Sequence, residues 1–546
     1  MKAIQVCRLQ KTLCFSVLAL FFFFPSAVYS SNVSSVQTGE FSVSASSTSG
    51  STTITSVADM GKTLLFYSLR ENEDEPRDGS CRVWLSSANT ISASRTSYEN
   101  SITIRYYVVE FDSGVTVQRG NTSISSGTYY DVTLSPAVDL SESFVLTSAL
   151  ERDGSIFSED DWFTARLTSS TNLRLQCYQM ESGTISWQVV EFDGASVQRG
   201  ETTMSTSDTY REVTIDSIDT LRSFLLCSTR QPDQDEYDIG ANVILGKIEN
   251  STTIRFEKDH GSNSMTIAYE VVTLPYGTVQ HSTQSVSSGT SQQDVTLSTP
   301  VDTSGSIAFA SSQQLMGQSL GKTTYNSNDI PGVASFTHEL VNSTTLRLQR
   351  NNTNGTSTVG WFVIDFTDPV IQFTSSSSNG SEGTTPANLQ LSLSRAIGLD
   401  VTVDYAVTGG TATGSGMDYT LASGTATITA GNTTVNISAT IVDDAVYEPN
   451  ETVIVTISNP TNATLGSNTT HTYTINENES MPAIQFTSTS SVGDEGTTPA
   501  NMQLTLSGVS SVNTTVDYAV TGGTATGGGT DYTLASGTAT ITAGNT

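Results

Sequence analysis

Six acidic residues in the C-terminal third of the chain have the type and spacing to bind a metal ion together. They are Glu382, Asp418, Asp443, Asp444, Glu448 and Glu451. Four of them fall within the nine residues of DDAVYEPNE, between two apolar segments that we expect to be strands, and the other two lie in Gly-rich segments. From Asp368 to Thr546 the chain has fifteen acids and one base, Arg395. Carboxylates without basic partners repel one another unless they are spread apart or bind a cation. Ca²⁺ takes about 6 to 8 oxygen ligands, which several loops at one end of a β-sandwich can supply.

The elements that must position these acids belong to a repeated module. The segment IQFTSSSSNGSEGTTPANLQLSL at Ile371 returns as IQFTSTSSVGDEGTTPANMQLTL at Ile484, an offset of 113 residues, and the following 32 residues repeat almost unchanged. The second copy stops at Thr546, which corresponds to Thr433, so we expect a module that lacks its last strands. The chain is therefore expected to be a fragment of a longer protein.

The motifs of this module resemble those of the Calx-beta domain, the seven-stranded sandwich of sodium–calcium exchangers, an integrin tail and many bacterial surface proteins. The matching segments are EG near the first strand, VDYAVTGGTAT leading to DYT, then SGTATITAG, and DDAVYEPNE before VIVTIS. The resemblance covers residues 369–479 in full and residues 482–546 as a truncated copy, about a third of the chain. It implies a β-sandwich with Ca²⁺ bound at one tip, held by the six acidic residues named above.

The end of the module departs from the family pattern. Family members often finish with a run of Asp after the last strand, whereas TINENE offers Asn476, Glu477, Asn478 and Glu479. The resemblance therefore implies a second ion less strongly than the first. Solvated acidic loops that hold no ion are the alternative for the whole cluster.

A second and more diverged repeat precedes Pro369. Its marker is YYVVEFDSGVTVQRG at Tyr106, with WQVVEFDGASVQRG, YEVVTLPYGTVQHS and WFVIDF at intervals of about 80 to 90 residues. Short alternating or apolar runs, broken by Gly, Ser, Asn and Asp every 8 to 12 residues, are typical of β-sandwiches. We therefore predict an all-β chain of tandem sandwich modules, with a four-bladed propeller as the alternative for the upstream part. The predicted upstream limits are 31–116, 117–196, 197–277 and 278–367.

Other candidate sites in the upstream repeats carry less weight. Acidic segments start at Glu71, Glu151 and Pro232, and Asp233, Asp235 and Asp238 resemble a Ca²⁺ loop only loosely; a solvated face is the favoured interpretation. Trp187 and Trp361 lie among apolar neighbours, which favours the core over a ligand platform.

Catalysis finds little support in the sequence. The segment GQSLG around Ser319 fits the nucleophile-elbow formula, but no strand–turn–helix pattern surrounds it. The four histidines are His260, His281, His338 and His471, and none has a partner at zinc-ligand spacing. We therefore expect no enzymatic activity from this chain.

The N-terminus and the composition indicate export. A basic start is followed by an apolar run from Thr12 to Phe24 and small residues up to Ser30, which predicts a signal peptide over residues 1–30; a membrane anchor is the alternative. The mature chain would keep three cysteines, so at most one disulfide can form within it. A net charge of −30 excludes nucleic acid and anionic lipid as expected partners.

These observations predict a secreted or cell-surface protein. We expect four repeats that present a binding surface, carried on a Ca²⁺-stiffened stalk of Calx-beta modules, with a cell-surface protein or a glycan as a possible partner. The alternatives are the non-catalytic accessory region of a larger secreted enzyme and a carbohydrate-binding repeat array. Rows of exposed Trp or Tyr on one face would favour the carbohydrate-binding array.

Overall fold

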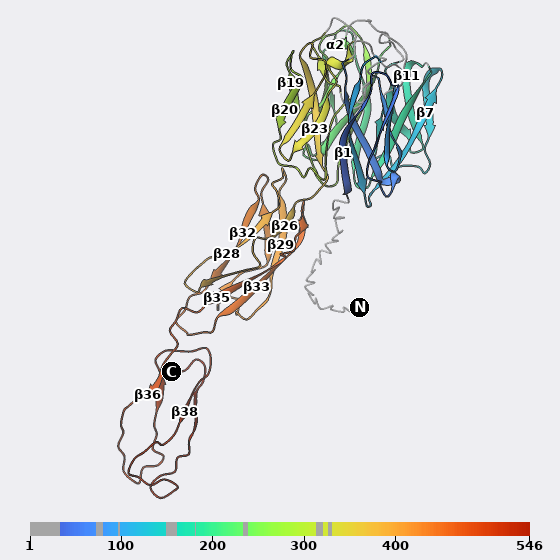
Figure 1. Cartoon of the computed structure of the whole chain (residues 1–546). Helices are drawn as coiled ribbons and strands as arrows, with labels where there is room; N and C mark the ends of the chain where they lie inside the picture. The colour runs from blue at the N-terminus through green and yellow to red at the C-terminus, as the bar shows by residue number, and fades with distance from the viewer. Residues whose placement is uncertain are drawn as a thin grey trace, which may run out of the picture.

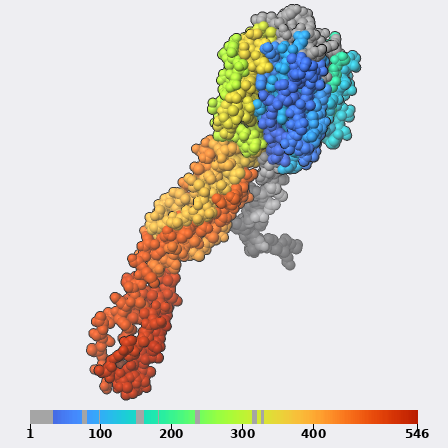
Figure 2. All heavy atoms as spheres, in the orientation of Figure 1, coloured from blue at the N-terminus to red at the C-terminus, as the bar shows by residue number. Residues whose placement is uncertain are grey.

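The chain forms a large β-rich head followed by two smaller modules in line (Figure 1; Figure 2). The computed structural model describes residues 33–72, 80–96, 99–148, 161–180, 182–232, 239–312, 320–325 and 330–546. We call residues 33–365 the head, residues 369–479 the first module and residues 482–546 the second module. The predicted signal peptide at residues 1–30 lies outside the described residues.

The head consists of four units, each with two antiparallel sheets; every sheet has three strands except the first-named sheet of the fourth unit, which gains the short strand β22 (Lys322–Thr323) as a fourth. In the first unit the sheet orders are β1-β6-β3 and β2-β5-β4. Its elements are β1 (Val33–Val43), β2 (Ser49–Thr53), η1 (Met60–Lys62), β3 (Thr63–Arg70), β4 (Arg82–Ser87), β5 (Thr90–Ser94) and β6 (Ile102–Phe111). Each unit is thus a small sandwich, whereas a propeller blade is a single four-stranded sheet.

The other three units repeat this order. The second contains β7 (Val115–Ile124), β8 (Gly127–Thr133), β9 (Ser143–Thr147), β10 (Thr164–Ser169), β11 (Asn172–Met180) and β12 (Gly183–Phe192). The third contains β13 (Ser196–Met204), β14 (Tyr210–Thr214), β15 (Ser223–Arg230), α2 (Ile239–Asn242), β16 (Leu245–Asn250), β17 (Thr253–Glu257) and β18 (Met265–Thr273). The fourth contains β19 (Thr278–Val286), β20 (Gln292–Thr296), β21 (Ser306–Ala310), β22 (Lys322–Thr323), η2 (Pro331–Val333), β23 (Thr337–Asn342), β24 (Thr345–Gln349) and β25 (Ser357–Asp365).

The four units share one core. Buried side chains from the first-named sheet of every unit, which we call the inner sheet, belong to a single cluster. At its centre the ring of Phe309 lies 4.9 Å from that of Phe66 and 5.6 Å from that of Phe224, which in turn lies 5.6 Å from Phe144. These four rings come from the third strand of each unit, and such aromatic pairs add about 0.5–1.5 kcal/mol each beyond their burial. The units are therefore one body.

Each unit is braced internally by the glutamine of its first strand. The side-chain amide of Gln37 donates to the carbonyl of Thr55 at 2.9 Å and accepts from the N–H of the same residue at 2.8 Å. The same double contact to the backbone 17 to 19 residues later is made in all four units. The residues that make it are Gln37, Gln118, Gln198 and Gln280. The repeated VQ pair in the sequence therefore has a structural cause within each unit.

Buried serines join each unit to the next. Ser148 Oγ accepts a hydrogen bond from the N–H of Val83 at 2.7 Å, and Ser228 Oγ accepts one from Ala165 at 3.1 Å. Ser311 Oγ donates to the carbonyl of Gly246 at 2.8 Å. The fourth unit contacts the first through Ser68, which accepts from the N–H of His338 at 3.1 Å. The latch serines, as we name this set, are Ser68, Ser148, Ser228 and Ser311, and they occupy equivalent positions. The four units therefore close into a ring.

The first module is a two-sheet sandwich. Its sheet orders are β30-β32-β28-β26-β34 and β27-β35-β33-β29-β31. The strands are β26 (Val370–Phe373), β27 (Ser377–Ser381), β28 (Ala387–Leu393), β29 (Val401–Gly410), β30 (Tyr419–Thr420), β31 (Gly424–Ile428), β32 (Thr434–Ile441), β33 (Glu451–Thr461), β34 (Thr464–Leu465) and β35 (Thr470–Asn476). β26 and β27 are parts of one long first strand, and β30 and β34 are two-residue pieces, so the ten segments agree with seven main strands. The predicted all-β sandwich fold is confirmed.

The second module shows two separate two-stranded sheets, β36-β37 and β38-β39. The strands are β36 (Ile484–Phe486), β37 (Leu504–Leu506), β38 (Thr514–Tyr518) and β39 (Gly537–Ile541). Phe486 is 56% exposed and Met502 is 58% exposed, whereas the equivalent Phe373 and Leu389 of the first module are 0% and 1% exposed. The apolar face of the second module is thus uncovered.

Candidate metal centre

The predicted acidic residues gather at the end of the first module that faces the second. Asp418 lies just before β30, Asp443 and Asp444 follow β32, and Glu451 begins β33. Glu382 follows β27 and is buried. Because all these strand ends meet at one tip of the sandwich, residues far apart in sequence come together there.

The first of two carboxylate clusters contains Asp418, Glu448 and Glu451. One oxygen from each side chain lies within 4.8 Å of the others. The loop before β30 is held by Asp418 itself, whose Oδ2 accepts a hydrogen bond from the N–H of Thr413. All three residues were predicted from the sequence as metal ligands.

The second cluster combines Glu382 with Glu477 and Glu479. Their carboxylate oxygens also lie within 4.8 Å of one another. Glu477 Oε2 accepts from the N–H of Glu448, so this residue joins the second cluster to the backbone of the first. Glu479 Oε2 is buried and has no hydrogen-bond partner among the described residues. An unpartnered buried carboxylate oxygen is the kind of group that a bound cation satisfies.

The remaining two predicted ligands lie at the rim of the clusters. Asp443 Oδ1 accepts from the side-chain amide of Asn478 at 2.9 Å, and Asp444 Oδ1 accepts from the N–H of Val446 at 2.7 Å. Neither belongs to a three-residue cluster among the described residues. Both carry charge close to the clusters, because Asp444 contributes to the raised pKa of Glu382 and Asp443 to that of Glu479.

Burial and mutual repulsion raise the pKa of several of these carboxyl groups. Burial and the neighbouring charges of Glu477 and Glu479 raise the pKa of Glu382 to about 7. Burial and a hydrogen bond to Asp418 raise the pKa of Glu451 to about 7. The pKa of Glu448 is also raised, by burial and then by the charge of Asp418. The tip therefore binds protons more readily than isolated carboxyl groups do, and a hard divalent cation could compete with those protons.

Sequence reasoning assigned no ligand role to Glu477 and Glu479. Both follow β35, and the segment TINENE was interpreted as weakening a second ion. The structure instead brings them against Glu382. The signal that could have found them is the pairing of β27 with β35, which places Ser381 opposite Asn476 and so Glu382 beside Glu477.

The same tip contacts the second module. The N–H of Tyr447 donates to the carbonyl of Val509 at 3.0 Å, and the N–H of Ser511 donates to the carbonyl of Tyr447 at 3.0 Å. Tyr447 lies in the acidic loop between Asp444 and Glu448. The loop that carries the carboxylates therefore also carries the contact between the modules.

The upstream candidates receive no comparable support. Asp233, Asp235, Asp238 and Ser319 lie outside the described residues, as do most of the acidic segments. Trp187 and Trp361 are 9% and 5% exposed, as expected for core residues. The remaining cysteines, Cys81, Cys177 and Cys227, are buried. In the described part of the chain, no helix has the length and apolar character needed to cross a membrane.

Comparisons with known proteins bear on the two modules. Among solved structures, the apo form of the Calx CBD1 domain is similar at 19% sequence identity, covering 21% of this chain and 99% of that chain with a TM-score of 0.19. The CBD12 of CALX1.2 is 17% identical, covering 32% of this chain and 70% of that chain with a TM-score of 0.19. The calcium binding domain CBD12 of CALX1.1 is 18% identical over the same shares, with a TM-score of 0.20. No curated protein matches the chain.

The family model that matches is that of the Calx-beta domain, over residues 365–479 and again over residues 477–546. These ranges agree with the sequence resemblance, which predicted a complete copy followed by a truncated one. The prediction of the domain family is thus confirmed for this part of the chain. The C-terminal third of the protein, residues 365–546, thus carries two successive matches to the Calx-beta domain.

Proposed function

We propose that the first module binds Ca²⁺ at its tip and that the chain is an exported, non-catalytic surface protein. The ligands in this proposal are Glu382, Asp418, Asp443, Asp444, Glu448 and Glu451, joined by Glu477 and Glu479. The observation that carries the proposal is the pair of carboxylate clusters, each with three oxygens within 4.8 Å. Eight carboxylates at one tip repel one another unless protons or cations offset their charge.

The arrangement of the chain supports a stalk-and-head role. The modules follow one another in line beneath the ring-shaped head (Figure 1). Arg395 of the first module lies 3.0 Å from the buried Asp365 of the head and donates to the carbonyl of Thr367 at 2.6 Å. A Ca²⁺ ion at the tip would tie the Tyr447 loop, and with it the second module, to the rest of the stalk. The two modules would then hold the head at a distance from the C-terminal end of the second module.

Calorimetry of the full chain tests the Ca²⁺ site. Millimolar Ca²⁺ should raise the melting temperature of the first module above that in chelator. The same experiment on Glu382→Gln should show most of this rise lost. Asp404→Asn is the matched control, because Asp404 is an exposed carboxylate on β29 that bonds Thr425 and Asn459 away from the tip. Equal melting temperatures with and without Ca²⁺ in the unmodified chain would contradict the proposal.

A glycan-binding head is the second candidate, and exposed tyrosines favour it. Tyr129 and Tyr210 occupy equivalent positions on β8 and β14 and are 52% and 53% exposed. The guanidinium groups of Arg174 and Arg255 lie 4.3 Å from the centres of these two rings. Aromatic rings beside charged groups are suited to sugar rings, which have apolar faces and polar edges.

A further inference from the structure

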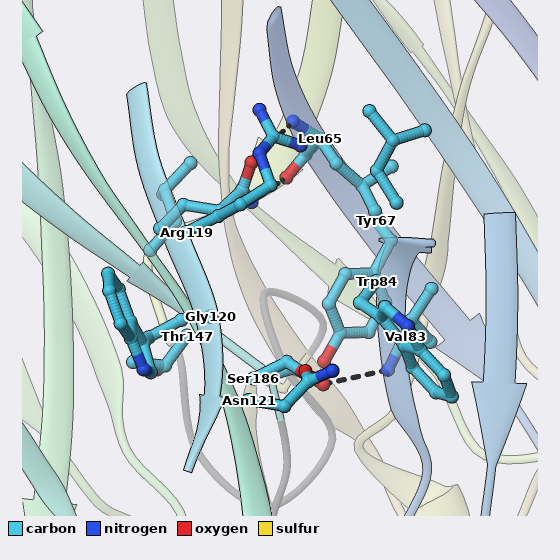
Figure 3. A pocket seen from close by; sticks show the side chains of 14 residues that line it. Leu65, Tyr67, Val83, Trp84, Arg119, Gly120, Asn121, Thr147 and Ser186 are labelled. Carbon is cyan, nitrogen blue, oxygen red and sulfur yellow. Dashed lines mark hydrogen bonds between the residues drawn. The ribbon is translucent and has the colours of Figure 1, made fainter. Parts of the chain in front are cut away.

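The first two seams of the ring contain cavities at equivalent positions. One lies between the first and second units and has a volume of about 70 Å³ (Figure 3). The other lies between the second and third units and has a volume of about 300 Å³. Their linings correspond residue by residue, because Arg119 and Arg199 share the VQRG position and Ser148 and Ser228 are both latch serines. The two seams therefore have the same strand arrangement and differ only in the side chains that line their cavities.

Two replacements between the seams account for the larger volume. Tyr67 and Trp84 line the first cavity and are labelled in Figure 3. The strand pairing makes Thr147 equivalent to Tyr67, and Arg166 equivalent to Trp84. Thr147 and Arg166 both line the second cavity. One aromatic ring is thus replaced by a small side chain and the other by a guanidinium group, so the second seam is left open and has a second arginine, while Glu270 stands where the first seam has Gln188.

The second cavity has apolar walls and a basic mouth. Leu226 and Leu167 are among its buried lining residues. Arg199 Nε lies 3.4 Å from Glu270 Oε1, and Arg199 Nη2 donates a hydrogen bond to the carbonyl of Ser143. The third nitrogen of this guanidinium group, Nη1, has no hydrogen bond among the described residues. Arg166 contacts Glu201 through Nη1 at 3.0 Å, and its Nε is buried without a partner in the described structure. Arg199 therefore brings an unused Nη1 donor to the cavity, and the guanidinium group of Arg166 lines the same cavity beside Glu201.

The two acidic side chains near the cavity, Glu270 and Glu201, already have hydrogen-bond or ion-pair partners. Glu270 Oε2 accepts from the N–H of Val145 at 2.7 Å, and burial raises the pKa of this carboxyl group. Glu201 is shared between Arg166 and Arg230, the latter at 2.6 Å. In a chain with a net charge of −30, a cavity lined by two guanidinium groups is a local exception. Charge-assisted hydrogen bonds from such donors favour anions over neutral ligands.

We propose that the seam between the second and third units binds a small organic carboxylate with a compact, partly apolar body. The carboxylate is held by Arg166 and Arg199, and the body occupies the space that Tyr67 and Trp84 fill in the first seam. A volume of about 300 Å³ is at the small end of ligand sites and fits a single six-membered ring. Acidic sugars, aromatic acids and alicyclic acids all combine a carboxylate with a compact ring. The inference rests on the proposed role of the head as a binding surface.

Titration calorimetry and ligand-observed NMR of the full chain test the site with three probes. Glucuronate and benzoate should both bind saturably if any compact carboxylate is accepted, and glucuronate alone should bind if the site selects a sugar acid. Glucose, the neutral counterpart of glucuronate, should bind at least about tenfold more weakly, because it lacks the charge-assisted contacts. Added NaCl should weaken the binding of the acids.

Variants assign the binding to the cavity. Arg166→Gln should weaken carboxylate binding about tenfold. Arg166→Trp, which restores the residue of the first seam, should abolish it with the head still folded. Arg347→Gln is the matched control, because Arg347 of β24 pairs with Asp294 in the fourth unit and does not line the cavity.

Three outcomes would overturn the inference. They are no saturable binding of either acid, equal binding of glucose and glucuronate, and equal weakening by the Arg166 and Arg347 variants. The Ca²⁺-dependent melting of the same samples is read separately. Loss of the Ca²⁺ response would contradict the proposed stalk site and leave the result on the head cavity standing.

Discussion

The hydroxyl oxygen of Ser68 accepts a hydrogen bond of 3.1 Å from the N–H of His338, 270 residues later in the chain. This contact joins the first unit of the head to the last. The hydroxyl of Tyr107 reinforces it by donating to the carbonyl of His338 and accepting from the N–H of Leu340, both at 3.1 Å. The ring is therefore closed by buried polar contacts as well as by the aromatic core.

Removing the latch hydroxyl should destabilise the whole head. Ser68→Ala leaves the buried N–H of His338 without its acceptor, which costs about 1–3 kcal/mol of unfolding free energy. Because the four units share a core, the head should still unfold in one transition, shifted to lower denaturant. Ser86→Ala, at an exposed serine of β4, is the control and should leave the midpoint unchanged. Separate transitions for the units would contradict the shared core.

The head should lose stability in acid through His338. Burial lowers the pKa of this imidazole from 6.5 to about 3. An imidazole whose pKa is lower in the folded state than in the unfolded state stabilises the fold at pH values above the unfolded pKa. This contribution to stability is lost as the pH falls from 6.5 towards 3. The loss is about 1.4 kcal/mol per pH unit in that window. His338→Val, which copies Val83 of the first unit, should flatten the dependence of the unfolding midpoint on pH; an unchanged slope would show that other groups cause it.

The sandwich fold was predictable from the sequence because short strands and turn residues alternate throughout. A closed ring was considered only in the alternative of a four-bladed propeller, although the third strands carry a signal for ring closure. TLLFYSLR in β3 and SIAFA in β21 are buried at nearly every position, whereas ANLQLSL in β28 alternates between buried and exposed residues. A continuous apolar run indicates a strand covered on both faces, which a free-standing sandwich does not need.

The candidate site was predictable in part. Asp418, Glu448 and Glu451 come together as expected, because the acidic loop and the Gly-rich loop lie at the same end of the sandwich. Glu477 and Glu479 were not assigned a role because their place depends on the pairing of β35 with β27, which no local pattern specifies. The cavity in the second seam could not be predicted either, since it depends on contacts between units.

Protons and Ca²⁺ should compete at the tip of the first module. Glu382 and Glu451 have pKa values raised to about 7. Without Ca²⁺, a raised folded-state pKa gives stability that is present below the ordinary value near 4.5 and is lost as the pH rises through about 7. The Ca²⁺-free module should therefore melt at a higher temperature at pH 5 than at pH 8. The rise in melting temperature caused by Ca²⁺ should be larger at pH 8 than at pH 6, and a rise independent of pH would exclude these two carboxylates as ligands.

Neutralising one ligand should separate repulsion from Ca²⁺ binding. Extracellular Ca²⁺ modules have dissociation constants of about 10⁻⁴ to 10⁻³ M, and a hundredfold excess of ion adds about 2.7 kcal/mol of stability. Glu451→Gln should remove much of this gain and leave the Ca²⁺-free melting temperature unchanged or slightly higher, because one repelling charge is gone. Calorimetry with Ca²⁺ and with chelator measures both effects. A full Ca²⁺ response in the variant would remove Glu451 from the ligand set.

The second module should not fold when residues 482–546 are expressed alone. Its two sheets have two strands each, and isolated two-stranded sheets are marginal in water. In the first module, β32 and β33 cover the residues equivalent to Phe486 and Met502, which are more than half exposed in the second module. Calorimetry of this fragment should therefore show no cooperative melt, while residues 369–479, which bury a complete core, should melt in one sharp transition. A sharp two-state transition of this fragment would contradict the prediction. It would mean that the four strands bury more apolar surface than the structure shows, because residues 482–546 contain no cysteine to form a disulfide and no helix to cover the sheets.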